Sequence, residues 1–515
     1  MYFRIVRCLT LVLVASLLAA GMAHADVNST ALAALLQRGG TVALAGRKID
    51  AGMLNRVYAE RDYRPIWNAE RRADLGTALA QAPSQGLDPE AFAVPNADPT
   101  ATEVLLTDAF MRYARALGRG LVTMSDVDSD WAIPQPTVDP AAVLTRALQH
   151  GVAATLAALP PQDADYARLR QAYRRYHDFT QRAAWRPITL KLPLKARASG
   201  PDVVKLRQRL AAEGLVAAGD SPRFDSALAA AVSRFQMARG LPPDGTVGQA
   251  TLAALNVTPG ARLRALRLNL ERRRAMPRAE PPNRVVVNVP DATVTLYQEG
   301  RAPLTMRVVV GAPNHPTPVL GATMVAVLLN PPWIVPTSIA VKELLPLARR
   351  DPGYLARNDY VYDGPSGQQL VQRPGPKNAL GRIKFELPNR FDVYLHDTPA
   401  KALLARTRRA LSHGCVRLEH PRAMAERVMA GNPQWTLDAI DAAIATGKTQ
   451  RLTLPHSIPV SIVYWTAYVD EDGTVEFRND VYGRDQRLDE ALVAHDMTEQ
   501  LPPSPPRAVA VGSQG

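Results

Sequence analysis

The hydrophobic periodicity of the chain changes near Arg284, and this change divides it into a helical part and a strand-rich part. Before Arg284, segments such as residues 101–121 repeat apolar side chains at a spacing close to 3.6 residues. After it, short β-rich runs such as residues 284–289 and 304–310 are separated by turn residues, which indicates an antiparallel sheet or barrel. A chain of 515 residues has room for roughly two to four domains, so we predict a multidomain α+β protein.

The N-terminus has the pattern of an export signal. Arg4 and Arg7 precede an apolar stretch over residues 9–20, and the small-x-small sequence of residues 23–25 offers a cleavage site. No later stretch approaches the roughly 20 apolar residues of a transmembrane helix. We therefore expect a signal peptide at residues 1–25 and a periplasmic protein without stable membrane insertion after its removal; an uncleaved leader acting as an anchor is the alternative.

The formal net charge is +13, from 61 Lys and Arg against 48 Asp and Glu. Outside the cytoplasm, a basic surface favours acidic partners such as anionic lipid, wall polymers or carboxylate-rich peptides. A generally basic surface without a specific partner explains the charge equally well. Export removes the protein from nucleic acid, which we therefore exclude as a partner.

The helical part divides into three segments. Residues 26–190 read as an Ala- and Leu-rich scaffold without a catalytic cluster. Residues 194–257 predict three short helices, and the first two carry apolar stripes at helical spacing. Those stripes are Val203, Leu206 and Leu210, then Leu228, Val232 and Phe235. Residues 258–283 predict a basic helix and a Pro-rich linker, with residues 271–274 on a solvated face.

The strand-rich part extends over residues 284–495. We expect a helical insertion from residue 338 to 354, within a cap of about residues 338–375, and a C-terminal hairpin at residues 458–478 that rejoins the sheet. The insertion is interpreted either as a mobile lid or as a fixed structural element. Residues 496–515 predict a disordered tail.

Cys415 is the only cysteine outside the leader, which holds Cys8. Exported proteins usually keep cysteines in disulfide pairs, so a lone one is either an inert buried residue or a thiol kept for chemistry. Its neighbours favour chemistry, because His413, Gly414 and Arg417 flank it and His396 lies upstream. Such surroundings can lower the pKa of a thiol and supply a general base.

The segment before His396 predicts how the thiol and the imidazole meet. Residues 391–396 alternate, which places Tyr394 and His396 on one face of a strand. Thr398 and Pro399 then predict a short helix that returns residues 412–415 to His396.

Each neighbour of the thiol has a predicted role. His396 takes the proton of Cys415 and returns it to a leaving amine. The backbone N–H groups of His413, Gly414 and Cys415 form an oxyanion hole, and Arg417 favours the thiolate or holds a substrate carboxylate. Ser412, Tyr394 and Trp333 are candidate substrate-binding residues, although core packing explains Tyr394 and Trp333 equally well. His315 has no neighbour of this kind in the sequence and is assigned to structure.

At these residues the chain resembles the L,D-transpeptidases with a YkuD-type catalytic domain. Their signature is a His, a spacer, then Ser/Thr-His-Gly-Cys, an apolar residue and usually Asn. Here Arg417 replaces that Asn, which resembles the larger, periplasmic YcbB-like subgroup. Residues 200–215 and 224–256 resemble the three-helix peptidoglycan-binding module of cell-wall enzymes. The resemblance extends over "NPPWIVPTSI", "GPKNALGRIKFELPN" and residues 464–485.

The resemblance implies a mostly β, sandwich-like catalytic domain with an inserted helical cap, and a two-step reaction. Cys415 attacks a peptidoglycan tetrapeptide stem at the third residue, meso-diaminopimelate, and releases D-Ala. An amine of a second stem then resolves the thioester to a 3→3 cross-link. The resemblance also implies covalent inhibition by carbapenems and neither a metal nor an organic cofactor.

Three alternatives stay open at this point. The same site is able to work as an L,D-carboxypeptidase with water as acceptor, or the chain is a non-catalytic peptidoglycan-binding protein. A redox role is disfavoured because no second mature cysteine exists to resolve a disulfide. The acceptor, the ligand of the three-helix module and the oligomeric state cannot be read from the sequence.

Overall fold

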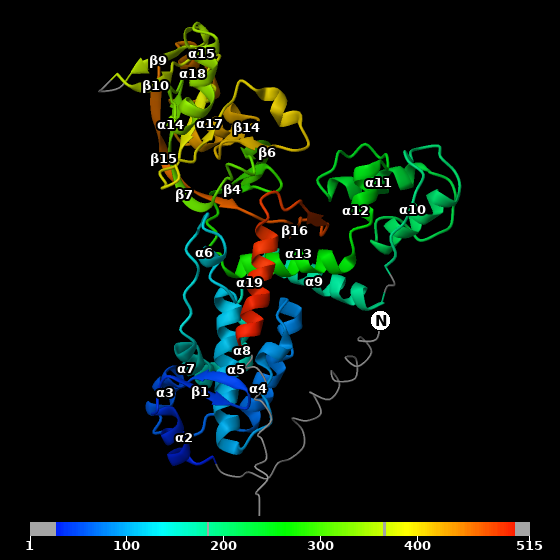
Figure 1. The fold of residues 1–515 in the computed structure, drawn as a ribbon, viewed down its shortest axis with the longest axis vertical. Coiled ribbons are helices and arrows are strands. Elements are labelled where there is room, and N and C mark those ends of the chain that lie inside the picture. The colour runs from blue at the N-terminus through cyan, green and yellow to red at the C-terminus, as the bar shows by residue number, and fades with distance from the viewer. Residues whose placement is uncertain (1–26, 183–184, 364–366, 500–515) are drawn as a thin grey trace, which may run out of the picture.

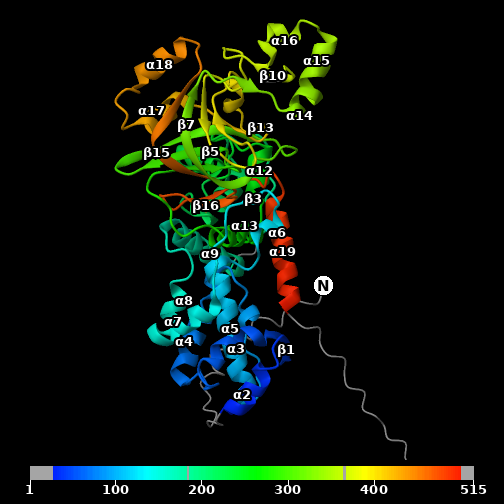
Figure 2. The same cartoon turned by 90° about the vertical axis from the view of Figure 1, so that its left-hand side faces the viewer.

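The computed structural model describes residues 27–182, 185–363 and 367–499 (Figure 1). The predicted signal peptide and residues 500–515 of the predicted tail lie outside these ranges. Helices α2 to α5, α7 and α8 occupy one end of the molecule and the large sheet the other, with α9 (Ala164–Arg182) and α13 (Pro259–Arg274) between them (Figures 1 and 2). Within the described ranges, no helix combines the length and apolarity needed to cross a membrane.

The N-terminal part is a helical bundle built around one long buried helix. Helix α5 (Pro99–Arg119) begins after the N-cap Asp98, whose side chain accepts from the N–H of Ala101, and has a proline in its first turn. The other elements surround it: α2 (Ser29–Leu36), β1 (Thr41–Leu44), β2 (Arg47–Asp50), α3 (Ala51–Ala59), α4 (Ala69–Leu79), α7 (Pro140–His150) and α8 (Val152–Ala157). The prediction of a purely helical segment therefore misses a short β-hairpin.

A loop of this bundle also takes part in the large sheet. After α6 (Met124–Val127), strand β3 (Trp131–Ala132) pairs in parallel with β7 (Val319–Leu329). Trp131 and Ile133 are buried in the same core cluster as the sheet. The boundary predicted at residue 190 therefore does not separate the packing of the two parts.

The predicted three-helix module is confirmed, with α10 (Pro201–Ala212), α11 (Ser226–Met237) and α12 (Gln249–Leu255). All six predicted stripe residues are at most 1% exposed. The side chain of Asp225 caps α11 by accepting from the N–H of Leu228. Local periodicity is enough to predict this module because each helix buries one apolar stripe.

Helix α13 (Pro259–Arg274) corrects the prediction of a solvated linker helix. Leu266 and Leu270 pack in one cluster with tyrosines of α9 (Ala164–Arg182). Glu271, Arg272 and Arg274 are at most 2% exposed. Each charge has a partner from another part of the chain or the same helix turn, so the helix is a buried junction and not a linker.

The ion pairs of α13 reach three parts of the molecule. Arg274 donates to Glu271 at 2.7 Å and to the carbonyl of Gln85 at 2.7 Å. Further pairs include Arg273 with Asp163, Arg272 with Asp485, and Arg262 with Glu213 of the three-helix module. The helix thus connects the bundle, the module and the C-terminal part.

The strand-rich part forms one large sheet that closes on itself. Its order is β11-β12-β14-β6-β5-β4-β15-β7-β3, and β11 also pairs with β7. The strands are β4 (Arg284–Asn288), β5 (Thr293–Gln298), β6 (Arg301–Gly311), β7 (Val319–Leu329), β11 (Ile383–Glu386), β12 (Leu395–His396), β13 (Ala410–Ser412), β14 (Val416–Leu418) and β15 (Gln450–Val463). The α+β class is confirmed, but the sheet is mixed and not purely antiparallel, because β12–β14 and β4–β15, among others, are parallel pairs. Helices α17 (Pro421–Met429) and α18 (Leu437–Ala445) contribute to the same core.

The predicted C-terminal hairpin needs correction. Residues 458–463 belong to the long strand β15 of the large sheet. Only β16 (Ala467–Val469) and β17 (Val475–Phe477) form a hairpin, which is a separate two-stranded sheet. The apolar side chains of this hairpin pack in one buried cluster with Tyr176 of α9 and Leu266 of α13. Helix α19 (Arg484–Glu499) then covers residues 496–499, which the sequence assigns to a disordered tail.

The insertion over residues 338–354 is helical, as predicted. It consists of α14 (Thr337–Ile339), the π-helix η3 (Ala340–Leu344), α15 (Leu345–Arg350) and α16 (Tyr354–Arg357). A small sheet with the order β8-β10-β9 completes this cap, from β8 (Trp333–Ile334), β9 (Tyr360–Asp363) and β10 (Gln369–Gln372). The cap has its own core around Val335, Leu344 and Leu370.

Candidate active site

Parallel pairing of β12 with β14 brings the predicted catalytic residues to one face of the sheet. Leu395 lies opposite Val416, and His396 lies opposite Arg417. Leu395 and Val416 are buried in the core, so alternation turns their sequence neighbours to the other face. Tyr394, His396, Cys415 and Arg417 therefore share this face. The connection that returns the chain is a 3-10 helix over Lys401–Ala405, shorter than the helix predicted from Thr398.

The turn that precedes β14 is held by Ser412 and Thr317. The Ser412 hydroxyl donates to the carbonyl of Cys415 at 2.6 Å and accepts from the N–H of Gly414 at 3.1 Å. Thr317, which the sequence did not single out, donates to the carbonyl of Gly414 at 2.7 Å. Gly414 has a φ of 112°, a conformation that strains any residue with a Cβ.

Two residues with predicted substrate or oxyanion roles are engaged within the turn. Ser412 is only 2% exposed and its hydroxyl is occupied there, so its contacts in this structure position the turn. The N–H of Gly414 is bonded to Ser412 and is not free for an oxyanion. Among the described residues, the N–H groups of His413 and Cys415 donate no hydrogen bond and remain available.

Cys415 is partly exposed at the start of β14. Burial raises the pKa of its thiol, and the N–H and hydroxyl of Tyr394 together with the charges of Lys384 and Arg417 offset only part of that rise. The expectation of a lowered thiol pKa is therefore wrong. The thiol of the resting protein is protonated at neutral pH and needs a base to become a nucleophile.

His396 is a buried, neutral imidazole. Its ring is 3% exposed, and burial together with the Arg417 guanidinium lowers its pKa to about 3. The backbone carbonyls of Asp397 and Leu380 oppose this shift. Nδ1 is enclosed and makes no hydrogen bond within the described residues. A neutral imidazole carries a proton on one ring nitrogen and a lone pair on the other, and the lone pair is able to accept a proton.

The lowered pKa of His396 predicts that the folded protein loses stability in acid. Between pH 6.5 and 3 the unfolded chain binds a proton at this position that the folded chain does not, so stability is lost as the pH falls. At pH 5 the loss is about 2 kcal/mol. Thermal unfolding at pH 7.5 and 5.0 should show a larger drop in Tm for the wild type than for His396→Gln. Equal drops in the two proteins would contradict the neutral, buried ring.

Tyr394 connects the thiol to the cap. The thiol of Cys415 and the side chain of Trp333 both lie close enough to the Tyr394 hydroxyl to influence its pKa, which burial raises, and the Tyr394 ring lies 5.6 Å from that of His396. Trp333 in turn contacts Tyr360 in the cap, with ring centroids 6.3 Å apart. Both predicted groove residues therefore lie at the site, Tyr394 beside the nucleophile and Trp333 on the cap side.

Lys384 is a site residue that the sequence reasoning missed. It lies opposite His396 across β11 and β12, and its Nζ is 4.0 Å from the centre of the Tyr394 ring. Alternation within β11 was a usable signal, because Ile383 and Phe385 are buried and Lys384 points the other way.

His413 makes a direct contact between the catalytic motif and the cap. Its Nε2 lies 2.6 Å from Oε1 of Glu343, which is carried by the π-helix η3. Its ring also lies 4.9 Å from the ring of His315, so His315 has a partner that the sequence did not reveal. Short π-helical segments are frequent at functional sites.

We expect Glu343→Gln to loosen the cap. The His413 and Glu343 side chains are 36% and 46% exposed, so their interaction contributes about 0.2–1 kcal/mol. Hydrogen exchange of residues 337–350 should accelerate up to about fivefold. Lys342→Gln, on the same π-helix, is the matched control. Unchanged exchange in Glu343→Gln would show that this contact does not hold the cap.

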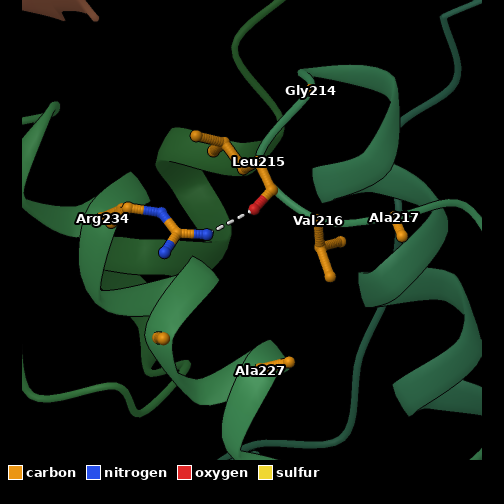
Figure 3. A pocket seen from close by; sticks show the side chains of 7 residues that line it. Gly214, Leu215, Val216, Ala217, Ala227 and Arg234 are labelled. Atoms are coloured by element: carbon orange, nitrogen blue, oxygen red, sulfur yellow. Dashed lines mark hydrogen bonds between the residues drawn. The ribbon is translucent and has the colours of Figure 1, made fainter. Parts of the chain in front are cut away.

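The three-helix module carries a separate open depression of about 570 Å³ (Figure 3). Residues from the α10–α11 connection and from α11 line it, among them Val216, Ala227 and Arg234. Arg234 donates to the carbonyl of Leu215 at 2.7 Å, which fixes one wall of the depression.

Three protein-family models match the chain. The YkuD model, described as the L,D-transpeptidase catalytic domain, matches residues 282–435, which include His396 and Cys415. A model described as the scaffold domain matches residues 53–172, and one described as a "Putative peptidoglycan binding domain" matches residues 199–255.

The similar proteins found by sequence and by structure comparison carry the name L,D-transpeptidase. The "Putative L,D-transpeptidase" of Haemophilus influenzae is 30% identical over 252 residues, 46% of this chain and 51% of that protein. The match thus spans about half of the relative. A solved L,D-transpeptidase from Mycobacterium smegmatis is 15% identical, with 35% of this chain and 58% of that one covered and a TM-score of 0.20. L,D-transpeptidase 3 from Mycobacterium tuberculosis, in complex with a faropenem-derived adduct, is 19% identical. The match covers 35% of this chain and 60% of that one, with a TM-score of 0.19.

At such TM-scores the solved structures carry no argument, whereas the domain matches agree with the motif at Cys415. Residues 282–435 of the chain are therefore similar to the YkuD L,D-transpeptidase catalytic domain, and the segments before them are similar to a scaffold domain and to a peptidoglycan-binding domain.

Proposed function

We propose that this protein is a periplasmic L,D-transpeptidase that forms 3→3 cross-links in peptidoglycan. The observation that carries the proposal is the partly exposed Cys415 thiol, on the same sheet face as the buried neutral His396 and within a matched L,D-transpeptidase catalytic domain. The donor is a tetrapeptide stem attacked at its third residue, meso-diaminopimelate. The peptidoglycan-binding-type domain supports the choice of polymer.

In the first step, His396 accepts the thiol proton as the sulfur of Cys415 attacks the carbonyl carbon. The oxyanion is held by the free N–H groups of His413 and Cys415. The C–S bond of the thioester forms, the amide C–N bond breaks, and His396 returns the proton to the departing amine of D-Ala. A pKa lowered to about 3 makes the resting imidazole a weak base, so we propose that it accepts the thiol proton in concert with the attack of the sulfur on the carbonyl carbon.

In the second step, the side-chain amine of another stem attacks the thioester. The new C–N bond forms, the C–S bond breaks, and the sulfur recovers a proton through His396. Water in place of the amine gives the tripeptide and makes the enzyme an L,D-carboxypeptidase. The Glu343–His413 contact ties the cap to the catalytic motif, and we propose that it restricts water at the thioester in favour of an amine acceptor.

The test is mass spectrometry of products from purified disaccharide-tetrapeptide incubated with the protein. We expect 3→3 dimers and free D-Ala, with Cys415→Ala producing neither. Tripeptide without dimer would establish the carboxypeptidase instead, and unchanged substrate with folded wild type would favour a binding protein. We also propose that carbapenems acylate Cys415, because they present an activated carbonyl to the same thiol.

A further inference from the structure

A row of three charged or titratable side chains crosses the sheet beside the thiol. Lys384 on β11 lies opposite His396 on β12, and His396 lies opposite Arg417 on β14. Alternation places all three on the face that carries Tyr394 and Cys415. Two cations therefore flank the general base, and both lower the pKa of the thiol.

Neither cation has an acidic partner among the described residues. Arg417 makes no ion pair there, and its enclosed Nε has no hydrogen bond. Within the described ranges Lys384 makes no ion pair, and its Nζ lies over the face of the Tyr394 ring. Several enclosed arginines of the chain have an acidic partner: Arg207 with Asp225, Arg239 with Glu213, Arg274 with Glu271, and Arg484 with Asp128. Arg209 is buried without one, but its guanidinium donates to the backbone carbonyls of Leu255 and Arg186. No hydrogen bond of the Arg417 guanidinium is seen within the described residues.

This contrast points to a binding role. A partly buried cation without a counter-charge costs free energy, which a fold offsets elsewhere by pairing it. Here the cost is visible in the site itself, because burial lowers the pKa of Arg417 and Arg417 lowers that of His396. An anion bound between the two side chains would remove the penalty.

We propose that Lys384 and Arg417 form a carboxylate-binding site that holds the terminal carboxylate of the residue leaving from the donor peptide. This inference rests on the proposed function. Arg417 follows Cys415 by two residues, about 6.6 Å along the strand. In a tetrapeptide the terminal carboxylate lies one residue beyond the attacked carbonyl, about 3.8 Å away, so a carbonyl at Cys415 places this carboxylate near the two cations. A guanidinium fork and an ammonium suit a carboxylate.

The first test needs no peptide substrate. Iodoacetate and iodoacetamide alkylate the same thiolate, so the ratio of their rates at Cys415 cancels differences in thiol pKa and exposure. We expect Lys384→Met and Arg417→Met each to lower the iodoacetate-to-iodoacetamide ratio by about 3–10-fold. Lys384→Arg should keep the ratio, as should Lys377→Met, which removes an exposed lysine bonded to the Arg357 carbonyl. In the wild type the ratio should fall as salt is added.

The second test compares donor peptides on the wild type. A tetrapeptide with its terminal carboxylate amidated should show a KM raised at least about fivefold, and Lys384→Met should reduce this preference. Amidation of the side-chain carboxylate of the third residue should have a smaller effect. If that second amide is the poorer substrate, the assignment to the leaving residue is overturned.

The outcomes separate the two proposals. If Lys384→Met and salt lower the iodoacetate-to-iodoacetamide ratio but no stem is turned over, the proposed function is refuted and the anion site is kept. The anion site would be refuted, and the proposed function kept, by two results together. The protein would turn over stems with a free and with an amidated terminal carboxylate equally well, and neither salt nor Lys384→Met would change the iodoacetate-to-iodoacetamide ratio. The salt series and the amidated donors use the wild-type protein, so an unstable variant does not prevent a decision.

Discussion

Replacing His396 with glutamine is expected to lower kcat/KM for acylation of Cys415 by tetrapeptide stems about 10²–10⁴-fold. The thiol has a raised pKa, so it depends on a base to lose its proton. Glutamine keeps the size and polarity of the ring but cannot accept and return a proton. Stopped-flow or quenched mass measurements of the acyl-enzyme would give the rate.

The pH profile distinguishes a catalytic role of His396 from a structural one. Because the pKa of His396 is lowered to about 3, wild-type acylation should show no limb near pH 6.5 and should rise with pH toward ionisation of the thiol. His420→Gln is the matched control, since His420 lies at the start of α17 with its side chain 63% exposed. A drop of less than about threefold in His396→Gln would remove His396 from the mechanism.

Replacing Glu271 with alanine is expected to cost about 3–5 kcal/mol of stability, because it leaves a buried guanidinium without its counter-charge. One oxygen of Glu271 pairs with Arg274 at 2.7 Å, and both side chains are 1% exposed. The other oxygen accepts from the backbone N–H groups of Leu121 and Val122 in the bundle. Denaturant unfolding followed by circular dichroism would measure the loss.

Arg264→Ala is the control on the same helix. Arg264 is 66% exposed and pairs with Asp489 at 3.5 Å, so its removal should change stability by at most about 0.5–1 kcal/mol. Similar effects of the two substitutions would show that α13 is not the junction between the bundle and the catalytic part.

The chemistry of the site could be predicted from the sequence where it depends on residues close in the chain. The motif around Cys415 and the alternation before His396 identify the nucleophile and the base. Glu343 could not be found in this way, because a cap contact brings it to the site. Alternation within β11 indicates the face on which Lys384 lies, but only the strand register places it opposite His396. The raised pKa of the thiol also depends on burial, which the motif does not contain.

The fold shows the same division. The three-helix module was predictable because each helix carries its own apolar stripe. The cluster of arginines on α13 was misread because its partners Gln85, Asp163 and Asp485 lie far away in the sequence. Charge periodicity cannot distinguish a solvated helix face from one whose counter-charges arrive from other segments.

The central claim is that Cys415 is an acylatable nucleophile, and intact-protein mass spectrometry after incubation with meropenem tests it most directly. The account predicts one covalent adduct on the wild type and none on Cys415→Ala, with both proteins giving the same circular dichroism spectrum. Absence of an adduct on folded wild type, or an adduct that persists on Cys415→Ala, would contradict it.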